Sequence, residues 1–352
     1  MLVGVFCGRV LAPFRSSTLK ARFLAVIAVC LFASQASAAP LSYNVTNLGT
    51  LPSGISSAAT AINGNGDVAG CVTYSDNSTQ AFIWTAANGM QAVGGPSSRA
   101  FGINNSDNVV GQTGGQAFRW DPVNGTVLLD PTHGGTANAI LNSGTVIGSR
   151  NFSGSRTIIW SSTNAISTPF PASNLSGSAI NNLNQFAGEG IDETFGYYNN
   201  GISNTLTVIG VLPDAMNDSR IAAGSFAAVA AFCDIDTSTT TIIGTLGTDT
   251  TSNALGINNA GTIVGVSNGT GAFIYDPTNG LQNLTSELAP AYSGWSILSA
   301  NAINDNGQIA ATGIFDGQQD AVLLTPVPEP STLVLALLTL PAVFWWRRRR
   351  SS

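Results

Sequence analysis

A ten-residue segment recurs seven times along this chain, and this repetition constrains the fold more than any other feature. Its first copy, Ala61 to Gly70, reads Ala-Ile-Asn-Gly-Asn-Gly-Asp-Val-Ala-Gly. The copies are anchored on an apolar residue at positions 62, 103, 140, 180, 216, 257 and 303, which are 36 to 46 residues apart. We read the fifth copy, starting at Ala215, as one loop residue shorter, and the last copy ends in Ala311 in place of glycine. A period of about 40 residues is typical of stacked or circular repeat units.

Each copy is followed by a pattern that indicates strands. An apolar residue, a variable residue and an aromatic residue form a triplet, as in Phe82-Ile83-Trp84. The other triplets are Phe118-Arg119-Trp120, Ile158-Ile159-Trp160, Phe195-Gly196-Tyr197, Phe232-Cys233-Asp234, Phe273-Ile274-Tyr275 and Val322-Leu323-Leu324. A turn dipeptide such as Asn88-Gly89 then precedes another short β-favouring stretch. Four antiparallel strands per unit predict an all-β fold, a β-propeller of seven four-stranded blades, with six or eight blades as alternatives.

The two ends of the repeat region predict how the ring closes. The last unit stops after its third strand, at Leu324, and lacks a fourth. An unpaired strand, Tyr43 to Leu51, precedes the first unit and ends like the fourth strands of other units. We therefore expect the N-terminal strand to complete the last blade and to leave no exposed sheet edge.

The units resemble the HAF-repeat family of bacterial extracellular proteins, which is named for a His-Ala-Phe triplet. In this chain the triplet appears as Gln80-Ala81-Phe82, Gln116-Ala117-Phe118 and Gly271-Ala272-Phe273, so the histidine is absent in each of these copies. The resemblance covers residues 44 to 325 and supports the repeat architecture. It implies no established activity.

The C-terminal segment, 327–352, has three parts that together indicate a membrane signal. The motif Val327-Pro328-Glu329-Pro330-Ser331 is followed by an apolar run, Leu333 to Trp346. A helix over this run would be roughly 21 Å long, and the basic residues that follow it would remain on the cytoplasmic side. These basic residues are Arg347, Arg348, Arg349 and Arg350.

This tail resembles the PEP-CTERM sorting signal of Gram-negative bacteria. The resemblance implies recognition by an exosortase-type membrane protease, removal of a short hydrophobic helix, and delivery to the cell surface or an exopolysaccharide matrix. The alternative is a C-terminal anchor that is never cleaved. In both cases the body of the protein is expected to be exported through transient or lasting attachment to the inner membrane.

The N-terminus also predicts export. Basic residues precede an apolar stretch, Phe23 to Ala33, and Ala36-Ser37-Ala38 has the small residues of a signal-peptidase site around Ala36 and Ala38. We therefore expect a signal peptide over 1–38, a propeller domain over 39–326 and a sorting segment over 327–352.

Charge and cysteine content narrow the possible partners. Residues 39–326 hold 18 acidic and five basic residues, a formal charge of −13, and no lysine. Such a surface repels nucleic acid, and it repels acidic polysaccharide unless a divalent cation bridges the two. Only Cys71 and Cys233 remain after removal of the signal peptide, and because they fall in units that are not neighbours we expect two separate buried thiols.

Few residues suggest catalysis. His133, the single histidine, is expected in an exposed loop rather than in a triad or metal site. Glu189, Asp192 and Glu193 form the one tight acidic group of the sequence. Such a group suggests an alternative function, a secreted glycoside hydrolase-like enzyme that uses carboxylates. The preferred interpretation is a solvated loop and a non-enzymatic platform that binds polysaccharide or surface proteins.

Two further features have competing interpretations. The runs Asn63 to Asp67 and Asn304 to Gly307 suggest hairpin turns more strongly than calcium loops, so no cofactor is expected, although weak surface calcium is compatible with the acidity. Tyr292 and Trp295, in the longest connection, either stack on sugar rings or belong to the core, and for Trp295 we favour the core.

Overall fold

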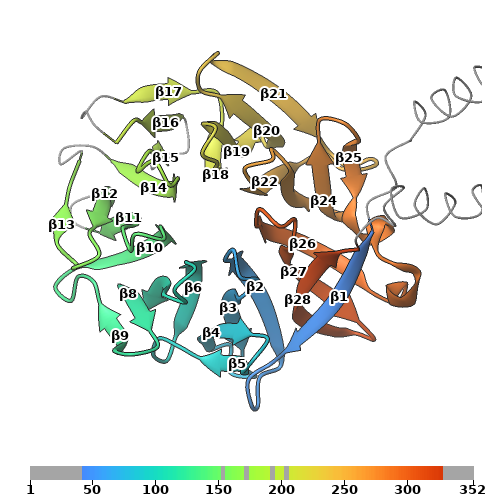
Figure 1. The fold of residues 1–352 in the computed structure, drawn as a ribbon, viewed down its shortest axis with the longest axis horizontal. Coiled ribbons are helices and arrows are strands. Elements are labelled where there is room, and N and C mark those ends of the chain that lie inside the picture. The colour runs from blue at the N-terminus through green and yellow to red at the C-terminus, as the bar shows by residue number, and fades with distance from the viewer. Residues whose placement is uncertain (1–41, 152–154, 170–173, 191–194, 202–205, 328–352) are drawn as a thin grey trace, which may run out of the picture. The chain divides into compact units, whose positions relative to one another are not determined.

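The computed structural model describes residues 42–151, 155–169, 174–190, 195–201 and 206–327. In this part of the chain, seven four-stranded antiparallel sheets are arranged as blades around a central axis (Figure 1). The predicted seven-bladed propeller is confirmed. The predicted C-terminal helix lies outside these ranges, and within them no helix is both long enough and apolar enough to span a membrane.

The strands follow one another outward from the axis in every blade. Blade 1 contains β2 (Ser56–Ile62), β3 (Val68–Thr73), β4 (Thr79–Thr85) and β5 (Gly89–Ala92). Blade 2 contains β6 (Ser98–Ile103), β7 (Val109–Thr113), β8 (Gln116–Asp121) and β9 (Gly125–Leu128). Blade 3 contains β10 (Gly134–Ile140), β11 (Val146–Asn151), β12 (Ser155–Trp160) and β13 (Ile166–Ser167). Blade 4 contains β14 (Leu175–Ile180), β15 (Phe186–Gly190), β16 (Gly196–Asn199) and β17 (Thr207–Ile209).

The remaining blades follow the same order. Blade 5 contains β18 (Leu212–Met216), β19 (Ile221–Phe226), β20 (Val229–Asp234) and β21 (Thr239–Gly244). Blade 6 contains β22 (Ser252–Ile257), β23 (Ile263–Ser267), β24 (Gly271–Asp276) and β25 (Gly280–Asn283). Two 3-10 helices, η1 (Leu284–Glu287) and η2 (Pro290–Tyr292), lead into blade 7. Blade 7 contains β26 (Ser296–Ile303), β27 (Ile309–Phe315), β28 (Gln318–Pro326) and β1 (Tyr43–Gly49).

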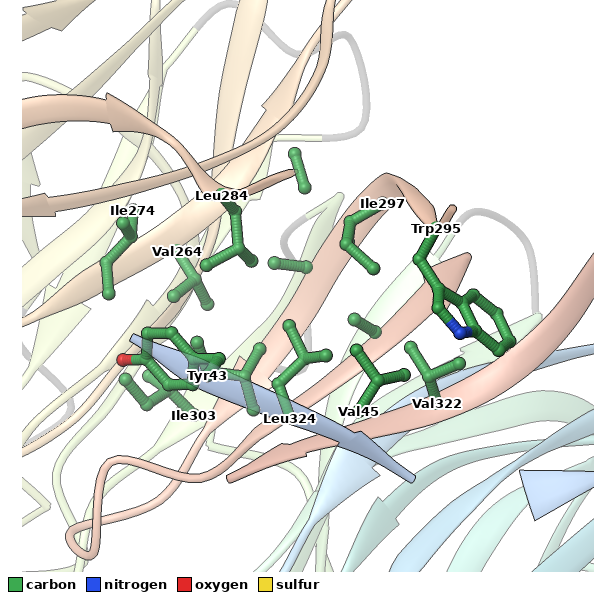
Figure 2. Packing of buried hydrophobic residues seen from close by; sticks show 14 residues of the cluster. Tyr43, Val45, Val264, Ile274, Leu284, Trp295, Ile297, Ile303, Val322 and Leu324 are labelled. Carbon is green, nitrogen blue, oxygen red and sulfur yellow. The ribbon is translucent and has the colours of Figure 1, made fainter. Parts of the chain in front are cut away.

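The ring closes as predicted, through the N-terminal strand. β1 pairs antiparallel with β28, with Tyr43 opposite Pro326 and Val45 opposite Leu324. Tyr43 and Val45 enter an apolar cluster with residues of blades 6 and 7, including Leu284 (Figure 2). The backbone N–H of Ala289 also donates to the carbonyl of Tyr43 over 2.8 Å. Closure therefore combines backbone pairing with burial of two β1 side chains.

The core of the propeller lies between its blades. Seven separate clusters of buried apolar residues occur in the described residues, and each joins two adjacent blades. In the cluster between blades 1 and 2, for example, Ile83 of β4 packs with Ile103 and Phe118. Because each blade buries its faces only against its neighbours, every blade contributes to the stability of the ring.

The glycine that ends most repeats is required by the pairing of the first two strands. A register shift between Ala59 and Ala61 brings the carbonyl oxygen of Ala58 within 2.1 Å of where a Cβ on Gly70 would lie. The ring of Phe82 lies 2.8 Å from the same point. In blade 7, where β26 has a second register shift, Ala311 occupies this position.

The structure corrects two details of the repeat alignment. In blade 4 the residue opposite Gly188 is Tyr197, so the triplet begins there and not at Phe195. In blade 5 the residue opposite Gly224 is Ala231, so the triplet is shifted by one from Phe232. In both blades the first triplet residue predicted from the sequence lies one or two positions from the residue that pairs with the repeat glycine. This pairing determines the register of the strand.

The expected loss of a loop residue in the fifth repeat is also wrong. Met216 pairs with Ala222, which is the same separation as Ile62 and Val68 in blade 1. The hairpin of blade 5 is therefore as long as the others.

Candidate functional site

A ring of asparagines surrounds one end of the central channel. The asparagine ring consists of Asn63, Asn104, Asn181, Asn217, Asn258 and Asn304, which directly follow the innermost strands and are 3% to 7% exposed. Each side-chain amide donates to the backbone carbonyl of the equivalent residue in the next blade, as Asn63 does to Asn104 over 3.1 Å. In blade 3 the equivalent residue is Leu141, which accepts from Asn104 but has no amide to donate. The ring thus links neighbouring blades at the axis at every interface except the one between blades 3 and 4.

Each of these asparagines also closes its own hairpin. The Oδ1 atom of Asn63 accepts the backbone N–H groups of Asn65 and Asp67 over 3.0 and 2.9 Å. Asn304 makes the equivalent bonds to Asn306 and Gln308 over 3.1 and 3.0 Å. The runs at 63–67 and 304–307 therefore form hairpin turns, as the sequence indicated.

The hairpins enclose a polar hollow at this end of the channel, which we call the hairpin cavity. Its volume is about 300 Å³, and it is lined by the members of the asparagine ring other than Asn104, by the residues that follow the ring positions and by the anchor residues that precede them. Asn259 donates its side-chain amide to the carboxylates of Asp218 and Asp305 over 3.2 and 2.9 Å. The carboxylates of this cavity are therefore already used to join neighbouring hairpins.

A belt of apolar side chains separates the hairpin cavity from a second hollow. The apolar belt consists of Ile62, Ile103, Ile140, Ile180, Met216, Ile257 and Ile303, which are the anchor residues of the seven repeats and line both hollows. The innermost strands run towards the hairpins, so residues that precede the belt lie on the side of the blade-to-blade connections. The repeat that defines the fold thereby also divides the channel.

The second hollow, which we call the Asp214 cavity, has a volume of about 210 Å³. The side chains two positions before the belt line it and vary between blades. They are Thr60, Phe101, Asn138, Ser178, Asp214, Leu255 and Asn301. Three of them donate across a blade interface: Thr60 to Ala100 O over 2.9 Å, Asn138 to Gly177 O over 2.7 Å, and Asn301 to Ala59 O over 2.6 Å.

Asp214 is the one ionisable residue among the described residues that line this cavity. Its Oδ2 atom accepts the side-chain amide of Asn253 over 2.8 Å. The residue is exposed to the channel, where the surrounding channel wall reduces its hydration, and this desolvation raises its pKa from 3.8 to about 6, against the opposing effect of the Asn253 bond. A carboxylate held in this way is prepared to accept hydrogen bonds from a cationic ligand.

Most residues of the predicted signal-cleavage site, sorting motif and basic end lie outside the described residues. This holds for Ala36, Ala38, Pro328, Glu329, Pro330, Ser331 and the four arginines Arg347, Arg348, Arg349 and Arg350. Val327, the first residue of the motif, is exposed, and its N–H donates to the carbonyl of Ser42 over 2.8 Å. The described chain therefore enters and leaves the propeller side by side.

His133 lies in the connection between blades 2 and 3, as predicted, but it is half-buried. Its Nδ1 atom contacts Thr132 Oγ1 at 2.7 Å and Asp130 Oδ1 at 3.1 Å. The carboxylate and the hydroxyl group thus face the same ring nitrogen, whereas the acid and the nucleophile of a catalytic triad face different ones. Asp130 also forms an ion pair with Arg150. Burial raises the pKa of the Asp130 carboxyl group, but the interactions with His133, Thr132 and Arg150 together lower it more, so the pKa lies below its usual value.

The predicted acidic group is described only in part. Glu189 is half-buried on β15, opposite Ser176 and Gly196. Asp192 and Glu193 lie outside the described residues, so their distance from Glu189 stays untested.

Two carboxylates meet at a place that the sequence did not suggest. Asn63 donates its amide to Asp67 of its own hairpin and to Asp107 of the next, both over 3.1 Å. Burial, followed by the charge of Asp67, raises the pKa of Asp107. No group of three or more potential metal ligands of the His, Cys, Asp or Glu type occurs among the described residues, and calcium binding stays a prediction.

The expectations for the cysteines and for Trp295 are confirmed. Cys71 and Cys233 are separate, buried free thiols. Trp295 is 8% exposed, belongs to the cluster that closes the ring, and stacks on Phe315 with ring centroids 5.2 Å apart. Tyr292 is half-buried against the same cluster.

The sequence analysis missed the residues of the Asp214 cavity. A signal was available, because these residues precede each belt residue by two positions and so share a face of the innermost strand. The residue type at this position varies from blade to blade, unlike that of the anchor residue two positions later.

No family model matches the chain, and no curated protein matches it. Among solved structures, the chain is similar to YCF48 bound to D1 peptide, with 9% identity over 82% of this chain and 96% of that one and a TM-score of 0.51. It is also similar to an oligogalacturonate lyase in complex with manganese, with 12% identity over 82% and 97% of the two chains and a TM-score of 0.49. An oligogalacturonate lyase from Vibrio parahaemolyticus gives 11% identity over 82% and 98% and a TM-score of 0.48. At such low identity, the likeness to the first of these shows the propeller fold alone.

Proposed function

We propose that this protein is exported, processed at a C-terminal PEP-CTERM sorting signal by an exosortase-type membrane protease, and delivered to the cell surface or extracellular matrix. There the propeller acts as a rigid, non-enzymatic binding platform for polysaccharide or surface proteins. The two predicted termini, the acidic body without lysine and the closed ring support this proposal.

One structural observation supports it most directly. The pairing that closes the ring runs from Tyr43 opposite Pro326 to Gly49 opposite Ala321. Both predicted processing sites, after Ala38 and at the motif that begins with Val327, fall outside this pairing. Removal of the signal peptide and of the tail would therefore leave every residue pair between β1 and β28 in place.

The test is fractionation of producing cells combined with intact-mass measurement of the protein in each fraction. We expect a mature protein that begins near Ala39, lacks the arginine-rich end, and is found outside the inner membrane. Glu329→Ala together with Pro330→Ala should keep the tail and retain the protein in the inner membrane. Pro326→Ala, two residues before Pro328, should be processed normally. An intact tail on protein released into the medium would contradict the proposal.

The alternative function is a secreted carbohydrate-active enzyme that uses Glu189, Asp192 or Glu193. Its support is the half-buried position of Glu189 beside two further acids in sequence. Hydrolysis of a polysaccharide by the purified protein, abolished in a Glu189→Gln, Asp192→Asn variant, would favour the enzyme. Glycan binding that survives this double substitution, without hydrolysis, favours the platform.

A further inference from the structure

The Asp214 cavity presents hydrogen-bond acceptors to whatever enters it. Asn138 and Asn301 each donate their amide across a blade interface, which directs the amide group towards protein. Their carbonyl oxygens have no hydrogen-bond partner among the described residues, and neither does the hydroxyl of Ser178. The ligand that suits such a lining is one rich in donors.

Asp214 adds the only formal charge within the part of the lining that the structure describes. Its Oδ2 atom is bonded to Asn253, while its Oδ1 atom has no hydrogen-bond partner in the described part of the chain. No arginine or histidine is found among the described residues that line the cavity, so none of these side chains neutralises the carboxylate. A cationic donor would supply both the missing charge and the missing bond.

Phe101 gives a second reason to expect a cation. It lines the same cavity and is half-buried, so part of its ring faces the channel. An aromatic face attracts ammonium groups, and it also packs against apolar C–H surfaces. The excess of acidic over basic residues in 39–326 attracts cationic partners over a longer range.

We propose that the Asp214 cavity binds the protonated amino group of an amino sugar at the end of a glycan chain, with the ammonium on Asp214 and the hydroxyl groups on Ser178, Asn138 and Asn301. This inference rests on the proposed function and specifies the ligand class of the platform. An amino sugar suits the site better than a lysine side chain because it brings hydroxyl donors for the acceptors around the ring, which a lysine side chain lacks.

The position of the cavity determines how the glycan enters. The apolar belt lies between this cavity and the hairpin cavity, so a polar ligand that arrives from the side of the blade connections meets the belt as a floor. A glycan chain that enters from this side with its end first reaches Asp214 before it reaches the belt. The protein is therefore expected to recognise chain ends rather than the middle of a polymer.

The test is calorimetric titration of the processed protein with three probes: a β-linked glucosamine tetramer, its fully N-acetylated counterpart, and tetralysine. We expect the glucosamine tetramer to bind about tenfold or more tightly than the N-acetylated one, since acetylation removes the charge. Asp214→Asn should weaken glucosamine binding by about the same factor. The matched control Asp316→Asn changes the same charge on an exposed hairpin, at a positive φ of 51° that asparagine tolerates, and should leave binding unchanged.

A second variant keeps the test valid if Asp214→Asn does not fold. Ser178→Phe fills the cavity without a change in charge and should also abolish binding, with a thermal midpoint showing that the variant is folded. Equal affinity for both tetramers, unchanged binding by the Asp214 variant, or tighter binding of tetralysine than of glucosamine would overturn the assignment. None of these outcomes affects cell fractionation, so failure of this inference is distinct from failure of the proposed function.

Discussion

The side-chain amide of Asn304 donates to the backbone carbonyl of Asn63 over 2.9 Å, although the two residues are 241 positions apart. This bond joins blade 7 to blade 1 at the axis. At the periphery, β1 pairs with β28 of blade 7 and leads into blade 1. The same asparagine also closes its own hairpin. A residue that the sequence marks as a turn former therefore also connects the blades.

Replacement of Asn304 by leucine, the residue found at the equivalent position 141, should lower the free energy of unfolding by about 3 kcal/mol. The variant loses the bond to Asn63 and leaves the N–H groups of Asn306 and Gln308 without their acceptor. Chemical denaturation monitored by tryptophan fluorescence measures the change. Asn306→Ala removes only an exposed bond to Gly64 and should cost less than about 1 kcal/mol. Equal denaturation midpoints for the two variants would show that the asparagine ring contributes no more to stability than an exposed hydrogen bond.

Closure of the ring should depend on the buried face of β1. Val45→Asp places a carboxylate among the apolar residues of blade 7 and should destabilise the protein by about 3 kcal/mol or more. Limited proteolysis should then cut the chain near β1 before the rest of the propeller. Asn44→Asp introduces the same group at the adjacent exposed position and should resist proteolysis like the parent protein. Equal resistance of the two variants would mean that β1 is not needed for closure.

The blade count and the closing strand could be predicted because both depend on local patterns. Each anchor residue, such as Ile62, is followed by a turn sequence whose residues determine the hairpin. The unpaired stretch that starts at Tyr43 and the missing strand after Leu324 are visible without any knowledge of spatial contacts.

The register of blades 4 and 5 could not be predicted from the same information. Phe195 and Tyr197 are two positions apart, so either can occupy one face of a strand, and the alternation does not choose between them. Pairing with Gly188 makes the choice in the folded sheet. The Asp214 cavity was missed for a related reason, since its lining comes from all seven blades and only the closed ring brings these residues together.

The glycine at the end of the first repeat should be nearly irreplaceable. Gly70→Ala would place a Cβ 2.1 Å from the carbonyl oxygen of Ala58 and 2.8 Å from the ring of Phe82. Since backbone must move to relieve the first contact, we expect a loss of about 4 kcal/mol or failure to fold. Gly89→Ala is a suitable control, because no atom lies within 4 Å of its Cβ position and only its positive φ of 68° carries a cost, about 1 kcal/mol. Tolerance of alanine at position 70 would mean that the first two strands can shift their register.

The stability of the protein should depend on pH through Asp214. Burial raises the folded-state pKa of this carboxyl group from 3.8 to about 6, so the folded protein binds more protons than the unfolded chain between these values. The stability linked to this group is therefore fully present below about pH 3.8 and is lost as the pH rises to about 6.

Asp214→Asn removes the titration, so the variant should have a higher thermal midpoint than the parent protein near pH 7, and the difference should shrink as the pH falls towards 4. Thermal melts of both proteins across this range measure the effect, and Asp316→Asn, on an exposed hairpin, should follow the parent curve. A difference between the Asp214 variant and the parent that stays constant with pH would show that the carboxyl group is not desolvated in the channel.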